Sequence, residues 1–150
     1  MNFAMFLIVA VSEEIIFRGL LFRMINDRFS TVLAFIIFSL TFGIIHLSTV
    51  DFWTAMAISI EAGLMLAAAY TLRNNLWVPI GIHWAWNFFL GAISGDGVSG
   101  ISQDTCVIIP EIIGSNILTG GNSGREGSFV TFILGLTIGI VLLRYKARKN

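Results

Sequence analysis

Five apolar segments dominate this chain and limit what it can fold into: residues 2–26, 31–47, 52–72, 77–94 and 128–144. A helix that crosses a bilayer needs about 20 mostly apolar residues, so each segment has the length or the apolarity of a span, although the second and fourth are slightly short. Only 12% of the 150 residues are charged, compared with about 25% in soluble domains. The sequence therefore predicts a single all-α domain over residues 1–150, a polytopic transmembrane bundle of about five helices.

A Gly- and Ser-rich stretch, residues 95–127, separates the last two segments, and its length indicates an external or functional loop rather than a tight turn. Most basic residues flank segment ends that would share one side, which predicts a cytoplasmic side with the C-terminus on it. Seven of nine basic residues obey this rule: Arg23, Arg28, Arg73, Arg144, Lys146, Arg148 and Lys149. The loop acids Asp96, Asp104, Glu111 and Glu126 then fall on the opposite side.

The overall charge excludes one class of function. The formal net charge is +0, so the chain has no global positive field that would recruit nucleic acid, and the expected surroundings are membrane lipid. The only cysteine, Cys106, leaves no disulfide within the chain.

Three ionisable residues, Glu13, Glu14 and Arg18, lie within six positions of the first segment, where a charge is costly and normally has a partner inside the protein. Glu14 and Arg18 are four residues apart on one helical face, so we expect an ion pair between them. Glu13 points about 100° away from Glu14 and remains for another partner. A buried ion pair that only fixes packing is the alternative interpretation. Glu61, within the third segment, is interpreted as a packing or lining residue.

Two histidines and an asparagine occupy other segments. His46 ends the second segment, and His83 and Asn87 share a face of the fourth. Taken singly, His46 would be an interfacial residue, and His83 with Asn87 would be polar residues that join two helices. Together with Glu13 they are the groups needed to hydrolyse an amide: a carboxylate base, imidazoles to orient water or bind metal, and an amide donor for the oxyanion.

Three motifs carry a family resemblance. Residues 13–18 match EExxxR, residues 42–46 match FxxxH and residues 83–87 match HxxxN. In this order they resemble the CPBP family, the Abi-like group of CAAX prenyl endopeptidases and of bacteriocin-processing and immunity proteins. The segment GGNSGREGS, residues 120–128, also resembles the family's approach to its last helix.

The resemblance implies an intramembrane endopeptidase that cuts a membrane-associated peptide or protein, prenylated or bacteriocin-like. Glu13 would be the general base and His46 would hold the same water. His83 and Asn87 would stabilise the oxyanion, and Glu14 with Arg18 would position the catalytic helix. The bacteriocin-linked branch implies a bacterial cytoplasmic membrane.

The resemblance leaves the role of a metal open. The family is often described as metalloproteases, and Glu13, His46 and His83 are candidate ligands for a divalent metal such as zinc, with water as a fourth ligand. The chain lacks HExxH. A metal-free glutamate mechanism uses the same residues.

Two features depart from the family pattern. Members usually have further helices before EExxxR, so we expect those N-terminal helices to be missing here or the chain to be a minimal member. Straight helices would also place His46 near the outer end of its span, while Glu13 is central, so convergence requires tilted helices. A non-catalytic binding or immunity module is the alternative function. An ion transporter has less support, since no inverted repeat is visible.

Overall fold

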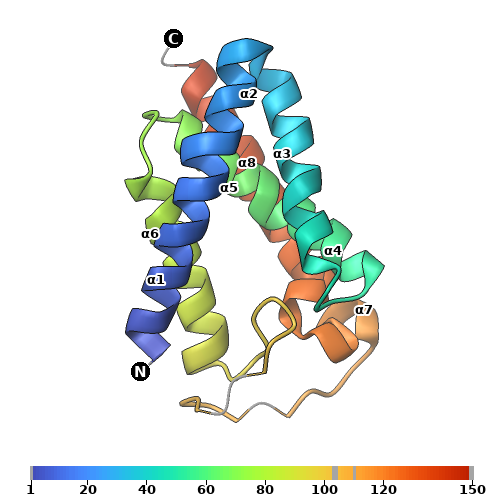
Figure 1. Cartoon of the computed structure of the whole chain (residues 1–150). Helices are drawn as coiled ribbons and strands as arrows, with labels where there is room; N and C mark the ends of the chain where they lie inside the picture. The colour runs from blue at the N-terminus through green and yellow to red at the C-terminus, as the bar shows by residue number, and fades with distance from the viewer. Residues whose placement is uncertain (1, 103–104, 110, 149–150) are drawn as a thin grey trace.

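The chain is mostly helical in the part that the computed structural model describes, which comprises residues 2–102, 105–109 and 111–148. Five long helical rods cross the molecule, as predicted, and their ends lie within a few residues of the expected ones (Figure 1). Four of them are α1 (Asn2–Glu14) continued by η1 (Ile15–Phe22) and α2 (Arg23–Arg28), α3 (Thr31–His46), α4 (Phe52–Ile58) continued by η2 (Ser59–Leu64) and α5 (Met65–Thr71), and α6 (Trp77–Asn87) continued by η3 (Phe88–Ile93). The fifth is α8 (Phe129–Ala147), which follows the short helices α7 (Asn116–Thr119), η4 (Gly121–Ser123) and η5 (Arg125–Gly127).

Side-chain caps fix where three of the rods begin. The Ser30 hydroxyl accepts a hydrogen bond from the Leu33 amide at the start of α3, and the Ser128 hydroxyl accepts one from the Thr131 amide at the start of α8. Asp51 does the same for α4, where its carboxylate accepts from two backbone amides. Ser, Thr, Asp and Asn favour this position because their oxygens satisfy amides that have no partner within the helix.

The third rod is the centre of the bundle. In the most apolar 18-residue stretch of Phe52–Thr71, 67% is buried inside the protein, compared with 17% in the corresponding stretch of α8. Glycines let neighbouring helices approach its middle segment, η2: a Cβ atom at Gly43 of α3 would lie 1.7 Å from the Ser59 hydroxyl, and one at Gly135 of α8 would lie 2.4 Å from the Glu61 Cβ. Small residues at helix crossings are typical of bundles within membranes.

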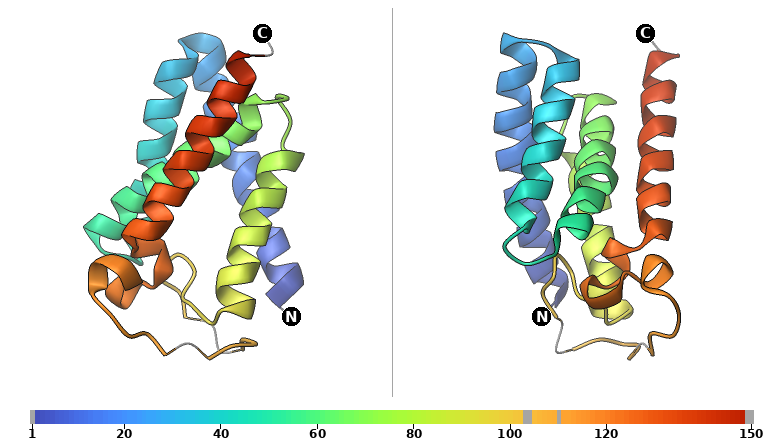
Figure 2. Two further views of the ribbon diagram at one scale, coloured as in Figure 1. Left: turned by 180° about the vertical axis from the view of Figure 1, so that it is seen from behind. Right: turned by 90° about the vertical axis from the view of Figure 1, so that its right-hand side faces the viewer.

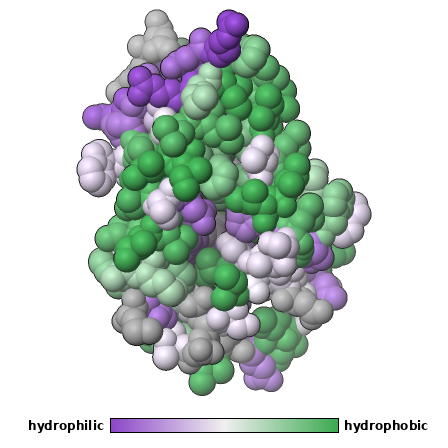
Figure 3. All heavy atoms as spheres, in the orientation of Figure 1, coloured by the Kyte–Doolittle hydropathy of each residue, from purple (hydrophilic) through white to green (hydrophobic). Residues whose placement is uncertain are grey.

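Two rods are long and apolar enough to cross a membrane, Phe52–Thr71 and Phe129–Ala147, and Thr31–His46 is a shorter apolar helix. Apolar surface covers most of the face in Figure 3, while polar surface gathers at the end near the C-terminus and in a hollow at the middle of the face. The all-α bundle is confirmed, whereas the number of rods that cross the bilayer stays a prediction.

The segments that were predicted to be cytoplasmic lie at one end of the bundle. The α2–α3 turn, the α5–α6 connection and the C-terminal end of α8 meet there, and the α3–α4 and α6–α8 connections lie toward the other end (Figures 1 and 2). The charge pattern and the fold therefore agree on which segments share a side, and which side faces the cytoplasm stays a prediction. Asp104 and Lys149 lie outside the described residues.

Candidate active site

Glu14 joins two helices at the centre of the bundle. Its Oε1 atom accepts a hydrogen bond of 2.7 Å from the Arg18 guanidinium, which is the predicted ion pair, and a second of 2.8 Å from Nδ1 of His83 on α6. Both Glu14 and Arg18 have 0% of their surface exposed. A carboxylate can only accept, so Nδ1 of His83 carries the hydrogen and Nε2 presents its lone pair. The first and fourth rods are thus joined through a single carboxylate oxygen.

The Arg18 side chain is surrounded by further partners. It donates to the Ala62 carbonyl at 3.2 Å, and its guanidinium lies 4.2 Å from the Phe38 ring centre and 4.7 Å from that of Phe42. Contacts of a cation with aromatic faces offset part of the loss of hydration. Arg18 therefore bridges η1, α3 and η2 and fixes the carboxylate of Glu14 among them.

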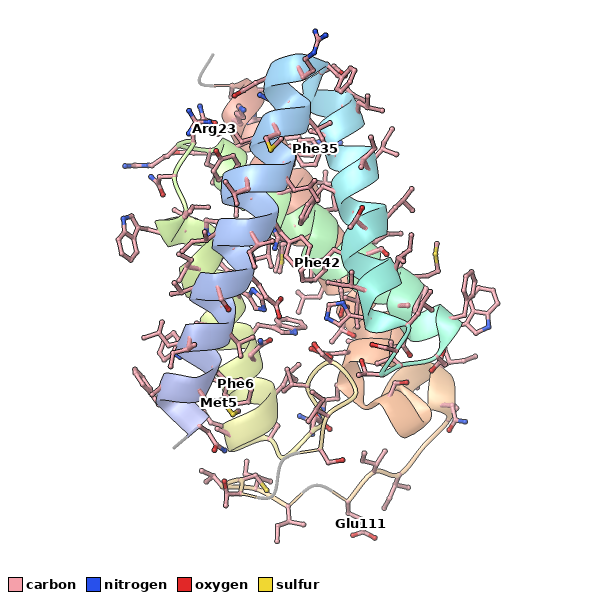
Figure 4. The ribbon with its side chains drawn as sticks, viewed as in Figure 1. Met5, Phe6, Arg23, Phe35, Phe42 and Glu111 are labelled. Carbon is pink, nitrogen blue, oxygen red and sulfur yellow. The ribbon has the colours of Figure 1, made fainter. Side chains whose placement is uncertain are left out.

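His46 is held by its own helix. Its Nδ1 atom donates to the Phe42 carbonyl at 2.6 Å, one turn earlier, and its ring packs against the Phe42 ring at 5.0 Å. Phe42 lies near the middle of the bundle, where α3 faces the first rod (Figure 4). As in His83, the bond made by Nδ1 leaves Nε2 of His46 as an acceptor. The FxxxH spacing therefore selects the tautomer of the imidazole.

Glu13 remains available for chemistry. Its side chain is 31% exposed, and its Oε2 atom lies 3.9 Å from Nε2 of His83. That separation is longer than a hydrogen bond and is suited to a shared water molecule. Of the two adjacent glutamates, one is therefore buried in a bonded network and the other is open, as the sequence predicted.

Two adjoining hollows bring the predicted residues together. A groove of about 540 Å³ is lined by Glu13, His46 and Asn87. A smaller cavity of about 20 Å³, large enough for one water molecule, is lined by His46, His83, Asn87, Glu61 and Glu126. His46 and Asn87 line both. Straight, parallel helices would place His46 and Glu13 at different depths in the membrane. The rods instead cross obliquely (Figures 1 and 2), and both residues line the same groove.

Two acids beside the predicted site were not assigned to it from sequence. Glu61 is only 2% exposed and lines the cavity, where it accepts a hydrogen bond from the Thr131 hydroxyl. Glu126 was expected in an external loop, yet it is 4% exposed, and its Oε2 atom accepts from the Ser99 amide at 2.6 Å. This part of the α6–α8 connection therefore folds back into the bundle, and its position outside the membrane stays a prediction. The Gly-rich motif at residues 120–128 was the signal that could have found Glu126.

Burial raises the pKa of Glu126 from 4.5 to about 7, although hydrogen bonds from Ser99 and Trp86 and the nearby His83 lower it. Asp96 raises it slightly further, and Glu61 is also close to this carboxyl. Below pH 4.5 Glu126 is protonated in both the folded and the unfolded chain. Between pH 4.5 and about 7 the folded chain keeps a proton that the unfolded chain has lost, so stability falls as pH rises through this window and is then level.

We expect Glu126→Gln to remove this contribution. A pKa raised from 4.5 to about 7 corresponds to about 3 kcal/mol, so the thermal midpoint of the wild-type chain in detergent should fall more steeply from pH 5 to pH 7 than that of the variant. Circular dichroism melts over this pH range measure both slopes. Equal slopes would contradict the assignment.

The suitability of the site for a metal depends on its donors and their geometry. In both histidines Nδ1 is held in a hydrogen bond, and the lone pair of Nε2 stays available to coordinate a metal. This is the usual arrangement around zinc. Within the described ranges, however, no three His, Cys, Asp or Glu side chains are placed to hold one metal ion. The geometry does not fit a bound metal, and the mechanism below uses side chains alone.

Comparisons with known proteins identify the family. The family model described as "Type II CAAX prenyl endopeptidase Rce1-like" matches residues 1–89, which include all three motifs. The chain is 30% identical over 110 residues to "Putative membrane peptidase YdiL" of Bacillus subtilis (strain 168), an alignment that covers 72% of this chain and 43% of that protein. No solved structure matches. Together with the two span-length helices, this indicates an integral membrane protein, and the chain belongs to the Rce1-like family of type II CAAX prenyl endopeptidases.

Proposed function

We propose that the chain hydrolyses a peptide bond in a membrane-associated substrate, with Glu13 as the general base. The observation that carries this proposal is the pairing of an open carboxylate with an oriented imidazole. Glu13 lies 3.9 Å from Nε2 of His83, and the ring of His83 is held by Glu14. An imidazole that a buried carboxylate orients toward the reacting groups is common in hydrolytic sites.

The proposed reaction begins with a water molecule between Glu13 and Nε2 of His83, which Nε2 of His46 also binds where groove and cavity meet. Glu13 takes a proton from this water as the oxygen attacks the substrate carbonyl carbon. The amide of Asn87 donates to the oxyanion that forms. The C–N bond then breaks, and Glu13 returns the proton to the leaving amine, so one water is consumed and an acid and an amine are released.

In this mechanism Glu14 orients the imidazole of His83 in addition to supporting the helix. By accepting from Nδ1 of His83 it fixes the tautomer, so that Nε2 faces Glu13. In its neutral form Nε2 of His83 accepts and does not donate, which leaves Asn87 as the main oxyanion donor.

The lining of the groove supports a proposal for the class of substrate. Its wall beside Glu13 is apolar and is formed by Met5, Phe6 and Val9 of α1 with Val98 and Ile101 of the loop. Met5 and Phe6 lie at the end of α1 away from Arg23 (Figure 4). We therefore propose an extended peptide with apolar side chains as the substrate. A prenyl group attached to that peptide is the narrower form of the proposal.

A cleavage assay in liposomes tests the function. The purified chain should cut a membrane-associated peptide, with both products identified by mass spectrometry, and His46→Ala should lower the rate by about 10²-fold because the attacking water loses an acceptor. The cleavage rates of farnesylated and unmodified forms of one peptide test the role of the prenyl group. The cleavage rate with and without a chelator tests whether a metal takes part. Peptide binding without any cleavage would instead support the non-catalytic binding module.

A further inference from the structure

A turn of the long α6–α8 connection forms one wall of both hollows. In Figure 1 the segment around residues 98–101 rises from the loop end of the molecule into the bundle. Ser99 lines the small cavity and also the groove. Val98 and Ile101 line the groove beside it. The shape of the proposed substrate site therefore depends on where this turn is held.

The turn has a conformation that needs support. Val98 and Ile101 pair as an isolated β-bridge, and both residues between them have positive φ angles, +53° for Ser99 and +78° for Gly100. Such angles are unfavourable for a residue other than Gly or Asn. A Cβ atom at Gly100 would lie 2.3 Å from the Thr49 carbonyl, so the turn packs closely on the connection that follows His46.

One buried carboxylate holds this turn against α6. Glu126 accepts the Ser99 amide at 2.6 Å and also a hydrogen bond from the Trp86 side chain. Trp86 directly precedes Asn87, follows His83 by three residues and lines the same cavity. Glu126 thus connects this loop turn to the helix that carries two proposed site residues, His83 and Asn87.

Glu126 is itself fixed by the segment around it. Arg125 forms an ion pair of 3.0 Å with Asp96, and the Ser123 hydroxyl donates to Asp51 at 2.7 Å. Gly120 has a φ of +81°, and a Cβ atom there would lie 1.6 Å from the Gly124 carbonyl, so only glycine fits this close turn. The carboxylate is therefore held in place before any substrate binds.

We propose that Glu126 is a positioning residue for the hydrolysis: it holds the 98–101 turn in place as a wall of the substrate groove and Trp86 in place as a wall of the adjoining cavity. This inference rests on the proposed function, since a positioning residue needs a reaction to serve. Glu126 does not line the groove that contains Glu13, so it acts through Ser99 and Trp86. Its loss should therefore weaken substrate binding more than it slows the chemical step.

Three variants of the full chain in liposomes test the proposal. Glu126→Ala removes the acceptor, and we expect the amide of Ser99 to exchange hydrogen about tenfold faster or more and the KM for peptide cleavage to rise by about tenfold, with a smaller change in kcat. Glu126→Gln keeps one acceptor oxygen for Ser99 and should recover most of both losses. Glu111→Ala, which removes an exposed acid of the same connection, should match the wild-type chain.

The readouts separate the two proposals. A wild-type exchange rate at Ser99 and a wild-type KM in Glu126→Ala would overturn the positioning role. Equal increases of the exchange rate and of KM in Glu126→Ala and Glu126→Gln, together with a loss of helical signal, would also overturn it. If the wild-type chain cuts no peptide, the proposed function fails and the catalytic part of this inference fails with it. The exchange rate at Ser99 then still decides whether Glu126 anchors the turn.

Discussion

Replacing Glu13 by Gln is expected to lower kcat for peptide cleavage by about 10²- to 10⁴-fold, the usual contribution of a general base. The amide has nearly the same shape as the carboxylate but cannot take a proton from water. Arg18 is paired with Glu14 and not with Glu13, and the Glu13 side chain is 31% exposed, so the fold should be retained. Single-turnover cleavage with the enzyme in excess measures the chemical step directly.

A matched control separates loss of the base from loss of a charge. Glu111→Gln makes the same chemical change at an exposed position of the α6–α8 connection and should leave kcat unchanged. Both variants should show the helical signal and thermal midpoint of the wild-type chain. Normal turnover by Glu13→Gln would refute the general-base assignment, and with it the mechanism proposed above.

The helices could be predicted from sequence because their signals are local. Long apolar runs end near polar or capping residues, and Ser30, Asp51 and Ser128 each stand directly before a rod. The sequence also predicted that Glu14 pairs with Arg18 while Glu13 stays available, since a helix places residues i and i+4 on one face. These features follow from the helical repeat and needed no knowledge of how the rods pack.

The rest of the site depends on contacts between distant segments. His83 lies 69 residues after Glu14, and no spacing rule predicts that its Nδ1 donates to the carboxylate that also binds Arg18. The burial of Glu126 arises because a polar, Gly-rich loop folds back onto the bundle, whereas composition alone favours an exposed loop. The oblique crossing of the rods, which brings His46 to the same groove as Glu13, is likewise a property of packing.

Replacing Arg18 by Met is expected to destabilise the bundle by about 3–5 kcal/mol, because it leaves the buried Glu14 carboxylate without its cation. The hydrogen bond to the Ala62 carbonyl and the contacts with Phe38 and Phe42 are lost as well. Unfolding of the detergent-solubilised chain, followed by circular dichroism against rising denaturant, measures the change. Cleavage should fall in parallel, since Glu14 also orients His83.

The first rod contains its own control for this prediction. Arg23 and Asp27 form a second i, i+4 ion pair, but at 3.6 Å and with 69% and 62% of their side chains exposed. An exposed pair contributes only about 0–1 kcal/mol, so Arg23→Met should be close to neutral.

In the double variant Glu14→Gln/Arg18→Met neither charge remains, and part of the stability lost in Arg18→Met should return. Equal effects of Arg18→Met and Arg23→Met would show that the buried network does not determine the stability of the bundle. Recovery of stability in the double variant without recovery of cleavage would instead separate the role of Glu14 in folding from its role in orienting His83.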